Sequence, residues 1–272
     1  MKNRVQKKLP SGPEAFEAYY SKLYPETWDP LKELLLQEPS KVQLINPFEG
    51  DISRAVYSLD PASFEVAKAL EAEQDQTVLD LCSAPGGKSL CLMYQTLGKV
   101  NLTCNELSEA RCKRLKSVLR EHLPESIYLG LKITQRDGSR WGLVHPNTYD
   151  RVLIDAPCSG ERHLLKTLKE LRHWTLKRAK GLHQRQVALI CAGFDSLLPG
   201  GRLVYSTCSI NPLENDEVVR VLLKKRKHAE MGSLDVSEFS GHGCATEFGF
   251  QIFPFEAGWG PMYLSAIEKR AN

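Results

Sequence analysis

The sequence predicts an α/β protein built on a mostly parallel, doubly wound sheet. From residue 77 to about residue 227, short runs of β-branched and aliphatic residues alternate with longer segments in which apolar residues recur at helical spacing. Several short runs end in glycine, a carboxylate or a cysteine, which is typical of the carboxyl edge of a parallel sheet. The length of 272 residues suits one such domain with a small appendage.

Residues 1–59 are expected to form a helical extension of this domain. Its first 12 residues are polar and basic and are expected to be disordered. Between residues 13 and 36, aromatic and aliphatic side chains recur at helical spacing with two interrupting prolines, which predicts two short helices. Residues 41–47 are expected to form a strand or an extended linker.

Residues 60–272 are expected to form the sheet domain. Asp60 is predicted to cap a helix that runs to about residue 71, with Pro61 at its first position. Seven strands are expected, over residues 77–81, 100–105, 127–134, 149–154, 203–206, 248–253 and 262–267. Further helices are expected over residues 88–97, 108–122, 177–198 and 215–227.

Two of the predicted strands end in a polar stretch that carries a cysteine. Residues 151–154 lead into Asp-Ala-Pro-Cys158-Ser, and residues 201–204 lead into Tyr-Ser-Thr-Cys208-Ser. If these strands are neighbours in a parallel sheet, both thiols emerge at the same edge, over one crevice.

The remaining cysteines predict neither a metal site nor a disulfide framework. The chain has eight cysteines but no Cys-x-x-Cys pair, so the usual zinc spacing is missing and no metal is expected. No secretory signal and no run of about 20 apolar residues is present. We therefore expect reduced thiols in a cytoplasmic protein, with the mitochondrial matrix as the alternative. Four cysteines in apolar segments are expected in the core: Cys91, Cys104, Cys112 and Cys191.

A glycine-rich loop follows the strand predicted over residues 77–81. It reads Cys82-Ser83-Ala84-Pro85-Gly86-Gly87-Lys88, which matches neither the P-loop pattern nor the dinucleotide pattern G-x-G-x-x-G. Two glycines let the backbone approach a ligand closely, and the next helix offers unpaired N–H groups. The alternative is an ordinary tight turn without a ligand.

Carboxylates close three successive predicted strands. They are Glu106, Asp137 (followed by Gly138) and Asp155. A carboxylate at the end of the second strand can accept hydrogen bonds from ribose hydroxyls. Because three carboxylates without a metal would repel a phosphate-rich ligand, the charge pattern fits S-adenosylmethionine, a nucleoside with a sulfonium and an ammonium group.

The net charge of +3 is unevenly distributed. Between residues 161 and 185, eight Lys and Arg residues oppose two Glu, directly after the Cys158 stretch. A basic segment beside a candidate active-site loop indicates a polyanionic substrate. The alternative is a solvated helix face.

Together these stretches resemble the Nop/Sun/Fmu family of RNA cytosine-5 methyltransferases. The matching segments are residues 60–63, 79–88, 137–138, 155–158 and 198–209, within a resemblance that covers roughly residues 13–270. Residues 161–163 and 259–263 are most similar to the mitochondrial rRNA and tRNA branch, and a compact bacterial relative is the other possibility. The resemblance implies a Rossmann-like class I methyltransferase with a seven-stranded sheet and S-adenosylmethionine as cofactor.

The resemblance also implies roles for individual residues. Cys208 would be the nucleophile that adds to carbon 6 of the cytosine, and Cys158 would help to release the adduct. Asp155 would hold the base edge beside the cofactor. The implied cofactor site comprises Cys82, Ser83, Ala84, Pro85, Gly86, Gly87, Lys88, Glu106, Arg111, Asp137, Gly138 and Asp155. Pro157, Arg162 and His163 would contact the RNA, although His163 is equally well explained as an ordinary loop histidine.

The expected function is therefore RNA methylation, of rRNA more than of tRNA, by a monomer that does not associate with membranes. No RNA-binding module follows the core and the N-terminal segment is short, so substrate choice is expected to come from the domain surface, a ribosomal particle or a protein partner. A DNA methyltransferase would use the Pro-Cys thiol as nucleophile, and an inactive RNA-binding or assembly factor would have lost Cys208 or Asp155. A dinucleotide-dependent dehydrogenase would carry G-x-G-x-x-G.

Overall fold

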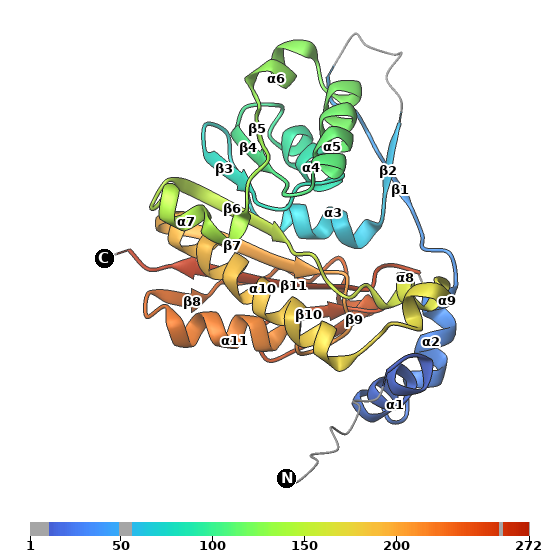
Figure 1. Ribbon diagram of the computed structural model, residues 1–272. Coiled ribbons are helices and arrows are strands. Elements are labelled where there is room, and N and C mark those ends of the chain that lie inside the picture. The colour runs from blue at the N-terminus through green and yellow to red at the C-terminus, as the bar shows by residue number, and fades with distance from the viewer. Residues whose placement is uncertain (1–10, 49–55, 256–257, 272) are drawn as a thin grey trace, which may run out of the picture.

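The computed structural model describes residues 11–48, 56–255 and 258–271 (Figure 1). Disorder is predicted for residues 1–12, and residues 1–10 lie outside the described part. The described helices are α1 (Pro13–Leu23), α2 (Trp28–Leu36), α3 (Pro61–Lys68), α4 (Gly87–Gln95), α5 (Glu109–His122), α6 (Glu125–Gly130), α7 (Trp141–Val144), α8 (Glu161–Lys166), α9 (Leu168–Leu171), α10 (Leu176–Ser196), α11 (Asp216–Lys225) and the 3₁₀ turns η1 (Gly138–Arg140) and η2 (Ser240–His242). The strands are β1 (Val42–Leu44), β2 (Tyr57–Leu59), β3 (Thr77–Asp80), β4 (Asn101–Asn105), β5 (Lys132–Thr134), β6 (Tyr149–Asp155), β7 (Leu197–Thr207), β8 (Ala229–Met231), β9 (Gly243–Ala245), β10 (Phe250–Ile252) and β11 (Met262–Lys269).

One sheet organises the molecule, in the order β5-β4-β3-β6-β7-β11-β10-β9, with β8 paired to β11. Strands β3 to β7 are parallel, whereas β11 runs antiparallel to β7, and β10 antiparallel to β11. The mostly parallel α/β prediction is confirmed. The described sheet has nine strands instead of seven, because the short β8 and β9 extend its antiparallel side.

Alternation along the strands gives the sheet two buried faces. Val78, Leu153 and Val204 point into one core, which α3, α4 and α5 cover. Their neighbours along the strands point to the opposite core, which α10 and α11 cover. The helices accordingly lie on both sides of the sheet (Figure 1). Continuous apolar strand runs follow from this, because a parallel sheet is buried on both faces.

The N-terminal helices form a separate small core with α8 and α9. Phe16, Tyr20 and Trp28 pack with Leu164 and Trp174. The rings of Tyr20 and Trp28 stack with centroids 5.1 Å apart. Residues 13–36 thus form the two predicted helices, and they lie beside the segment that follows Cys158 (Figure 1).

The strand predicted over residues 127–134 is mostly wrong. Residues 125–130 form α6, and only residues 132–134 form β5. Pro124 precedes the helix and Gly130 ends it, which are ordinary boundary signals for a helix. From α6, Ile127 and Tyr128 pack against the core on the α5 side of the sheet, so the helix buries the apolar residues that suggested a strand.

The predicted cap of α3 is confirmed. Asp60 Oδ1 accepts a hydrogen bond from Ala62 N at 2.9 Å, and Pro61 opens the helix. The same carboxylate accepts from Gly260 N at 3.0 Å, so it also fixes the loop before β11.

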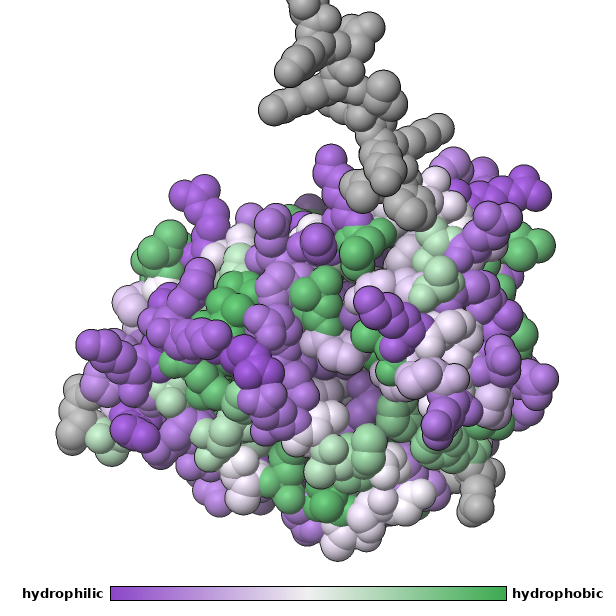
Figure 2. Space-filling view, turned by 90° about the horizontal axis from the view of Figure 1, so that it is seen from below, coloured by the Kyte–Doolittle hydropathy of each residue, from purple (hydrophilic) through white to green (hydrophobic). Residues whose placement is uncertain are grey.

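In the described ranges, no helix is both long and apolar enough to cross a bilayer. On the face that points downward in Figure 1, hydrophilic side chains surround small groups of hydrophobic ones (Figure 2).

Candidate active site

The two cysteine stretches meet at the carboxyl edge of the sheet, as the sequence predicted. Strands β6 and β7 are parallel neighbours, and Asp155 lies opposite Ser206 in their register. Beyond these strand ends, Cys158 Sγ lies 2.9 Å from Cys208 Sγ, and both thiols are free. Cys208 is exposed and Cys158 is half-buried, so the Cys208 thiol is the more accessible of the two.

The two thiols have different protonation properties. The contact with Cys208 and burial raise the pKa of the Cys158 thiol well above its ordinary value. Cys158 therefore keeps its proton at neutral pH, and its Sγ is in hydrogen-bond contact with Cys208 Sγ. A protonated thiol beside an exposed one supplies both a nucleophile and a proton donor within one contact.

Lys88 and Asp155 form an ion pair beside the thiols. Lys88 Nζ at the start of α4 lies 2.7 Å from Asp155 Oδ2 at the end of β6. Ser206 Oγ donates to the other carboxylate oxygen at 3.2 Å, and Lys88 Nζ donates to Ser63 Oγ at 3.3 Å. Burial alone would lower the pKa of Lys88, but the Asp155 carboxylate outweighs burial and raises it. Lys88 is therefore protonated at neutral pH.

The glycine-rich loop is shaped by a left-handed residue and by an arginine. Gly86 has φ +118°, a conformation that a side chain disfavours, and it caps α4. Arg111 Nη2 donates to Ala84 O at 2.6 Å, and Arg111 Nη1 lies 3.4 Å from Glu106 Oε2. Glu106 also accepts from Ser108 N at 2.8 Å. The loop, the end of β4 and the start of α5 are therefore tied together.

Two cavities flank this loop and share Cys82 in their walls. The first has a volume of about 180 Å³ and is lined by Tyr57, Ser58, Leu59, Ser63, Asp80, Cys82, Ser83, Ala84, Pro85, Gly87, Lys88 and Asp155. The second has a volume of about 370 Å³ and is lined by Leu81, Cys82, Asn105, Glu106, Leu107, Ser108, Arg111, Gly138, Pro157, Leu182, Arg185 and Leu189. Ten of the twelve residues predicted for the cofactor line one of these cavities.

The other two predicted cofactor residues, Gly86 and Asp137, are not in these walls. Gly86 acts through the backbone turn, and a Cβ atom there would lie 3.2 Å from Leu115 Cδ1. Asp137 is exposed and its Oδ1 accepts hydrogen bonds from Ser139 N and Oγ, which lower its pKa. Its carboxylate caps η1, while the adjacent Gly138 lines the larger cavity.

Comparison with known proteins agrees with this geometry. A family model described as 16S rRNA methyltransferase RsmB/F matches residues 67–268. The chain belongs to this family. The family comprises S-adenosylmethionine-dependent RNA cytosine-5 methyltransferases.

Two curated relatives and one solved structure illustrate the similarity. The mitochondrial tRNA (cytosine(34)-C(5))-methyltransferase of Danio rerio is 34% identical over 249 residues, which covers 88% of this chain and 67% of the relative. The 5-cytosine rRNA methyltransferase NSUN4 of Mus musculus is 36% identical over 228 residues, which covers 78% of this chain and 60% of the relative. A methyltransferase homologue of Pyrococcus horikoshii superposes with a TM-score of 0.76 at 19% identity, covering 94% and 95% of the two chains. This structural likeness confirms the class I methyltransferase fold.

The residues predicted to contact RNA lie in two places of this RsmB/F family member, the wall of the larger cavity and helix α8. Pro157 lines the larger cavity, and its carbonyl accepts from Gln186 Nε2 at 3.0 Å. Arg162 is half-buried and donates to Gln37 O at 3.4 Å. His163 is 69% exposed in its side chain, with Nε2 3.5 Å from Glu170 Oε1. Arg162 and His163 thus lie on α8, directly after the Cys158 loop.

Sequence reasoning missed several residues in the cavity walls. Asp80 and Asn105 are almost fully buried at the ends of β3 and β4, two positions before Cys82 and one position before Glu106. Arg185 was assigned to the basic RNA-facing segment, but it lines the larger cavity. Asp80 and Asn105 could have been predicted from the sequence, because each is a polar residue at or next to the end of a predicted strand. The helical segment of Arg185 carries no comparable signal.

The described residues offer no cluster of metal ligands. Within residues 11–48, 56–255 and 258–271, no group of three or more His, Cys, Asp or Glu residues could hold a metal ion.

Proposed function

We propose that this protein methylates carbon 5 of a cytosine in RNA with S-adenosylmethionine as methyl donor. The observation that carries the proposal is the 2.9 Å contact between Cys158 and Cys208 beside the Lys88–Asp155 pair and the two cavities. Membership of the RsmB/F family supports the same chemistry. The chain spans 67% and 60% of the length of the two relatives named above.

In this proposal Cys208 is the nucleophile. Its sulfur adds to carbon 6 of the cytosine, and the electron density gained by the ring makes carbon 5 able to accept the methyl group. The proton on carbon 5 then passes to a water molecule, and the electron pair left behind re-forms the double bond between carbons 5 and 6 as the bond from carbon 6 to the Cys208 sulfur breaks. Cys158, which holds a proton 2.9 Å from Cys208 Sγ, supplies a proton to the departing sulfur. Asp155 orients the base edge.

The cavity residues suit the methyl donor, which supplies an electrophilic methyl group on a sulfonium. Asp80 Oδ1 is buried without a hydrogen-bond partner and belongs to a residue lining the smaller cavity, so it can accept from an ammonium group. Burial raises the pKa of Asp80 to about 6, which leaves it mostly ionised at neutral pH. Glu106 in the larger cavity can accept from ribose hydroxyls.

The RNA is proposed to approach over α8 and α10, whose basic residues follow the Cys158 loop. Arg162 and His163 are the candidates for phosphate contacts, and the target base must leave its stack to reach Cys208. We propose rRNA as the substrate, as for the mouse relative, with tRNA as the alternative suggested by the zebrafish relative. A ribosomal particle or a protein partner is proposed to aid selection.

We propose that residues 60–272 form the catalytic domain of a monomer and residues 1–59 its helical extension. A cytoplasmic location is proposed, with the mitochondrial matrix as the alternative. The Danio rerio relative, which is named as mitochondrial, supports the alternative.

The test compares the two thiols. Purified protein is mixed with S-adenosylmethionine and with rRNA or tRNA, and 5-methylcytosine is mapped by bisulfite sequencing. Cys208→Ala should abolish methylation without a covalent adduct. Cys158→Ala should accumulate a protein–RNA adduct that survives denaturing electrophoresis, because methyl transfer outpaces release.

Cys244→Ala is the matched control, since Cys244 is an exposed free thiol outside the cavity walls. It should retain methylation. An adduct in Cys208→Ala but not in Cys158→Ala would reverse the roles. Full methylation by the Cys208→Ala variant would refute the proposed function.

A further inference from the structure

Two glutamates lie fully buried behind the thiols. Glu161 and Glu214 have no exposed surface. The groups that donate to them are hydroxyls, backbone N–H groups and one side-chain amide. Burial, reinforced by the Glu214 charge, raises the pKa of Glu161 to about 7, and burial also raises the pKa of Glu214. Burying carboxyl groups among neutral donors is costly, so their position calls for an explanation.

Glu161 extends from the Cys158 loop and binds the Cys208 loop. It begins α8, three residues after Cys158. Its Oε1 accepts from Ser209 Oγ at 2.9 Å, and its Oε2 accepts from Ile210 N at 3.1 Å. Because Ser209 and Ile210 directly follow Cys208, this carboxylate ties the Cys158 loop to the Cys208 loop.

Glu214 makes the same connection in the opposite direction. It lies six residues after Cys208, and its Oε2 accepts from Ser159 N at 2.9 Å. Ser159 Oγ donates to its Oε1. Gln186 Nε2 on α10 also donates to Oε2 at 2.9 Å, and to Pro157 O. The residue next to Cys158 is therefore held by a side chain from the Cys208 loop.

We call Glu161 and Glu214 the crossed pair, because each accepts hydrogen bonds from the loop that holds the other thiol. Helix α1 lies outside this pair and supports it. Tyr20 OH donates to Glu161 Oε1 at 2.5 Å. Tyr19 OH donates to Asn211 Oδ1 at 3.0 Å, and Tyr24 OH donates to Ile210 O at 2.5 Å. Tyr19 on α1 and Tyr24 at its C-terminal end thus hold the segment after Cys208, while Tyr20 holds Glu161.

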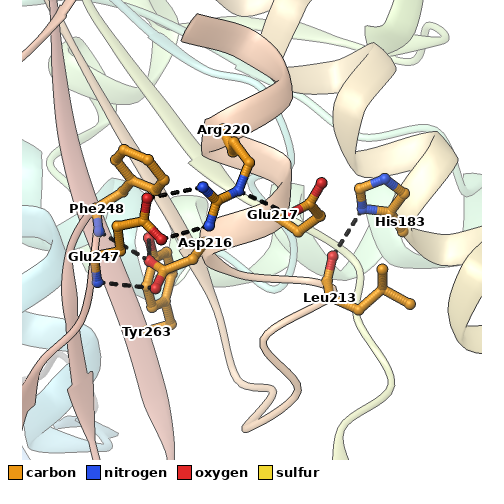
Figure 3. A network of polar contacts seen from close by, with 8 residues as sticks. All are labelled: His183, Leu213, Asp216, Glu217, Arg220, Glu247, Phe248 and Tyr263. Carbon is orange, nitrogen blue, oxygen red and sulfur yellow. Dashed lines mark hydrogen bonds and ion pairs between the residues drawn. The ribbon is translucent and has the colours of Figure 1, made fainter. Parts of the chain in front are cut away.

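Helix α10 holds the same segment from its other side. His183 Nδ1 donates to Leu213 O at 2.7 Å, one residue before Glu214 (Figure 3). The Cys208 loop is therefore fixed at both ends by elements that are distant in sequence.

We propose that Glu161 and Glu214 are positioning residues that hold the Cys158 and Cys208 sulfurs in contact, with α1 as part of the frame. For catalysis the inference rests on the proposed function, whereas its geometric content does not. If it is correct, either glutamate determines how often the two thiols meet, although neither touches the reacting atoms.

The direct test measures the meeting of the thiols. The full chain is treated with diamide, which oxidises two neighbouring thiols to a disulfide, and the rate of the Cys158–Cys208 link is followed by peptide mass spectrometry. Glu161→Ala and Glu214→Ala should each slow the link by about tenfold, because a lost hydrogen-bond set of about 1.4 kcal/mol corresponds to that factor. Glu161→Gln, which keeps an acceptor oxygen, should restore most of the rate.

Asp216→Asn is the matched control. Asp216 lies two residues after Glu214, and its carboxylate also accepts several hydrogen bonds, among them Tyr263 OH at 2.8 Å and Phe248 N at 3.2 Å (Figure 3). These bonds join Asp216 to β11 and to the turn before β10 rather than to a thiol loop. Asp216→Asn should link its thiols at the wild-type rate.

Ser159→Ala keeps the test informative if a glutamate variant does not fold, since it removes only one donor to Glu214. It should slow the link by a few-fold while circular dichroism stays unchanged. Unchanged link rates in folded Glu161, Glu214 and Ser159 variants would overturn the inference.

Enzyme kinetics give a second readout, which separates this inference from the proposed function. If the wild type methylates RNA, the glutamate variants should lower kcat by about tenfold with little change in KM for S-adenosylmethionine. A slowed disulfide in the variants together with an inactive wild type would support the crossed pair and refute the function. A lowered affinity for S-adenosylmethionine with an unchanged link rate would refute the crossed pair.

Discussion

The cofactor half and the thiol half of this active site treat their carboxylates differently. In the cofactor half, Asp155 is paired with Lys88 and Glu106 with Arg111. In the thiol half, Glu161 and Glu214 are buried among neutral donors. Asp155 and Glu106 are thus balanced by cations beside the cavities, whereas Glu161 and Glu214 belong to a closed network of hydrogen bonds.

This difference indicates that the carboxylates of the cofactor half bind ligands, whereas those of the thiol half maintain the local structure. A carboxylate that shares a cation beside a cavity can exchange part of its contacts for a bound ligand. A buried carboxylate saturated by hydroxyl and backbone donors has no room for exchange, because each lost donor leaves an unsatisfied group in low dielectric. We therefore expect variants in the cofactor half to change chemistry and affinity, and variants in the thiol half to change geometry and stability.

The largest effect is expected from breaking the Lys88–Asp155 pair. Asp155→Asn leaves the nearly buried Lys88 ammonium without its counter-charge and removes the group proposed to orient the base. The methylation rate should fall by about a thousandfold, which corresponds to about 4 kcal/mol of lost transition-state stabilisation from the charged group beside the base. Single-turnover methyl transfer measures this rate.

Glu247→Gln is the control for this variant, because Glu247 pairs with Arg220 at the surface (Figure 3). Its activity should stay within about twofold of the wild type, as an exposed pair contributes little. Wild-type activity in Asp155→Asn would show that the cofactor half does not depend on its ion pair.

An intermediate effect is expected on the pH dependence of stability. The folded-state pKa of Glu161 is about 7, above the 4.5 of an ordinary glutamate, so the folded protein holds this proton to higher pH. Its contribution to stability is complete below pH 4.5 and is lost as pH rises through about 7, by up to about 3 kcal/mol. Urea unfolding at several pH values should show this decline in the wild type and a flatter profile in Glu161→Gln.

Glu109→Gln serves as the comparison for that profile, since Glu109 is an exposed residue on α5. It should reproduce the wild-type decline. A profile for Glu161→Gln that is as steep as the wild type would show that Glu161 is ionised without cost, contrary to its buried setting.

The smallest effect is expected from Glu106→Gln. The amide keeps an acceptor for Ser108 N but loses the charge that favours ribose hydroxyl donors and Arg111. Affinity for S-adenosylmethionine should fall by about tenfold, as expected for a hydrogen bond to a charged acceptor. Isothermal titration calorimetry measures the change, and unaltered affinity would remove Glu106 from the cofactor site.

Local patterns predicted much of this structure because they act over a few residues. Asp60 and Pro61 begin α3 as expected, and the strand ends place Glu106, Asp155 and both thiols at one edge. Residues 127–130 show the limit. Their apolar pattern suits a strand or a helix, and packing against α5 and its neighbours favours the helix.

The sequence by itself determined the sheet, the glycine-rich loop and the two cysteine stretches, because strand alternation and turn residues are written into short segments. Only the tertiary structure decided which distant groups hold those stretches. Glu161 meets Ser209 across 48 residues, Glu214 meets Ser159 across 55, and Tyr20 meets Glu161 across 141. No local pattern marks such partners, because their contact exists only once β6 and β7 are neighbours and α1 is docked beside them.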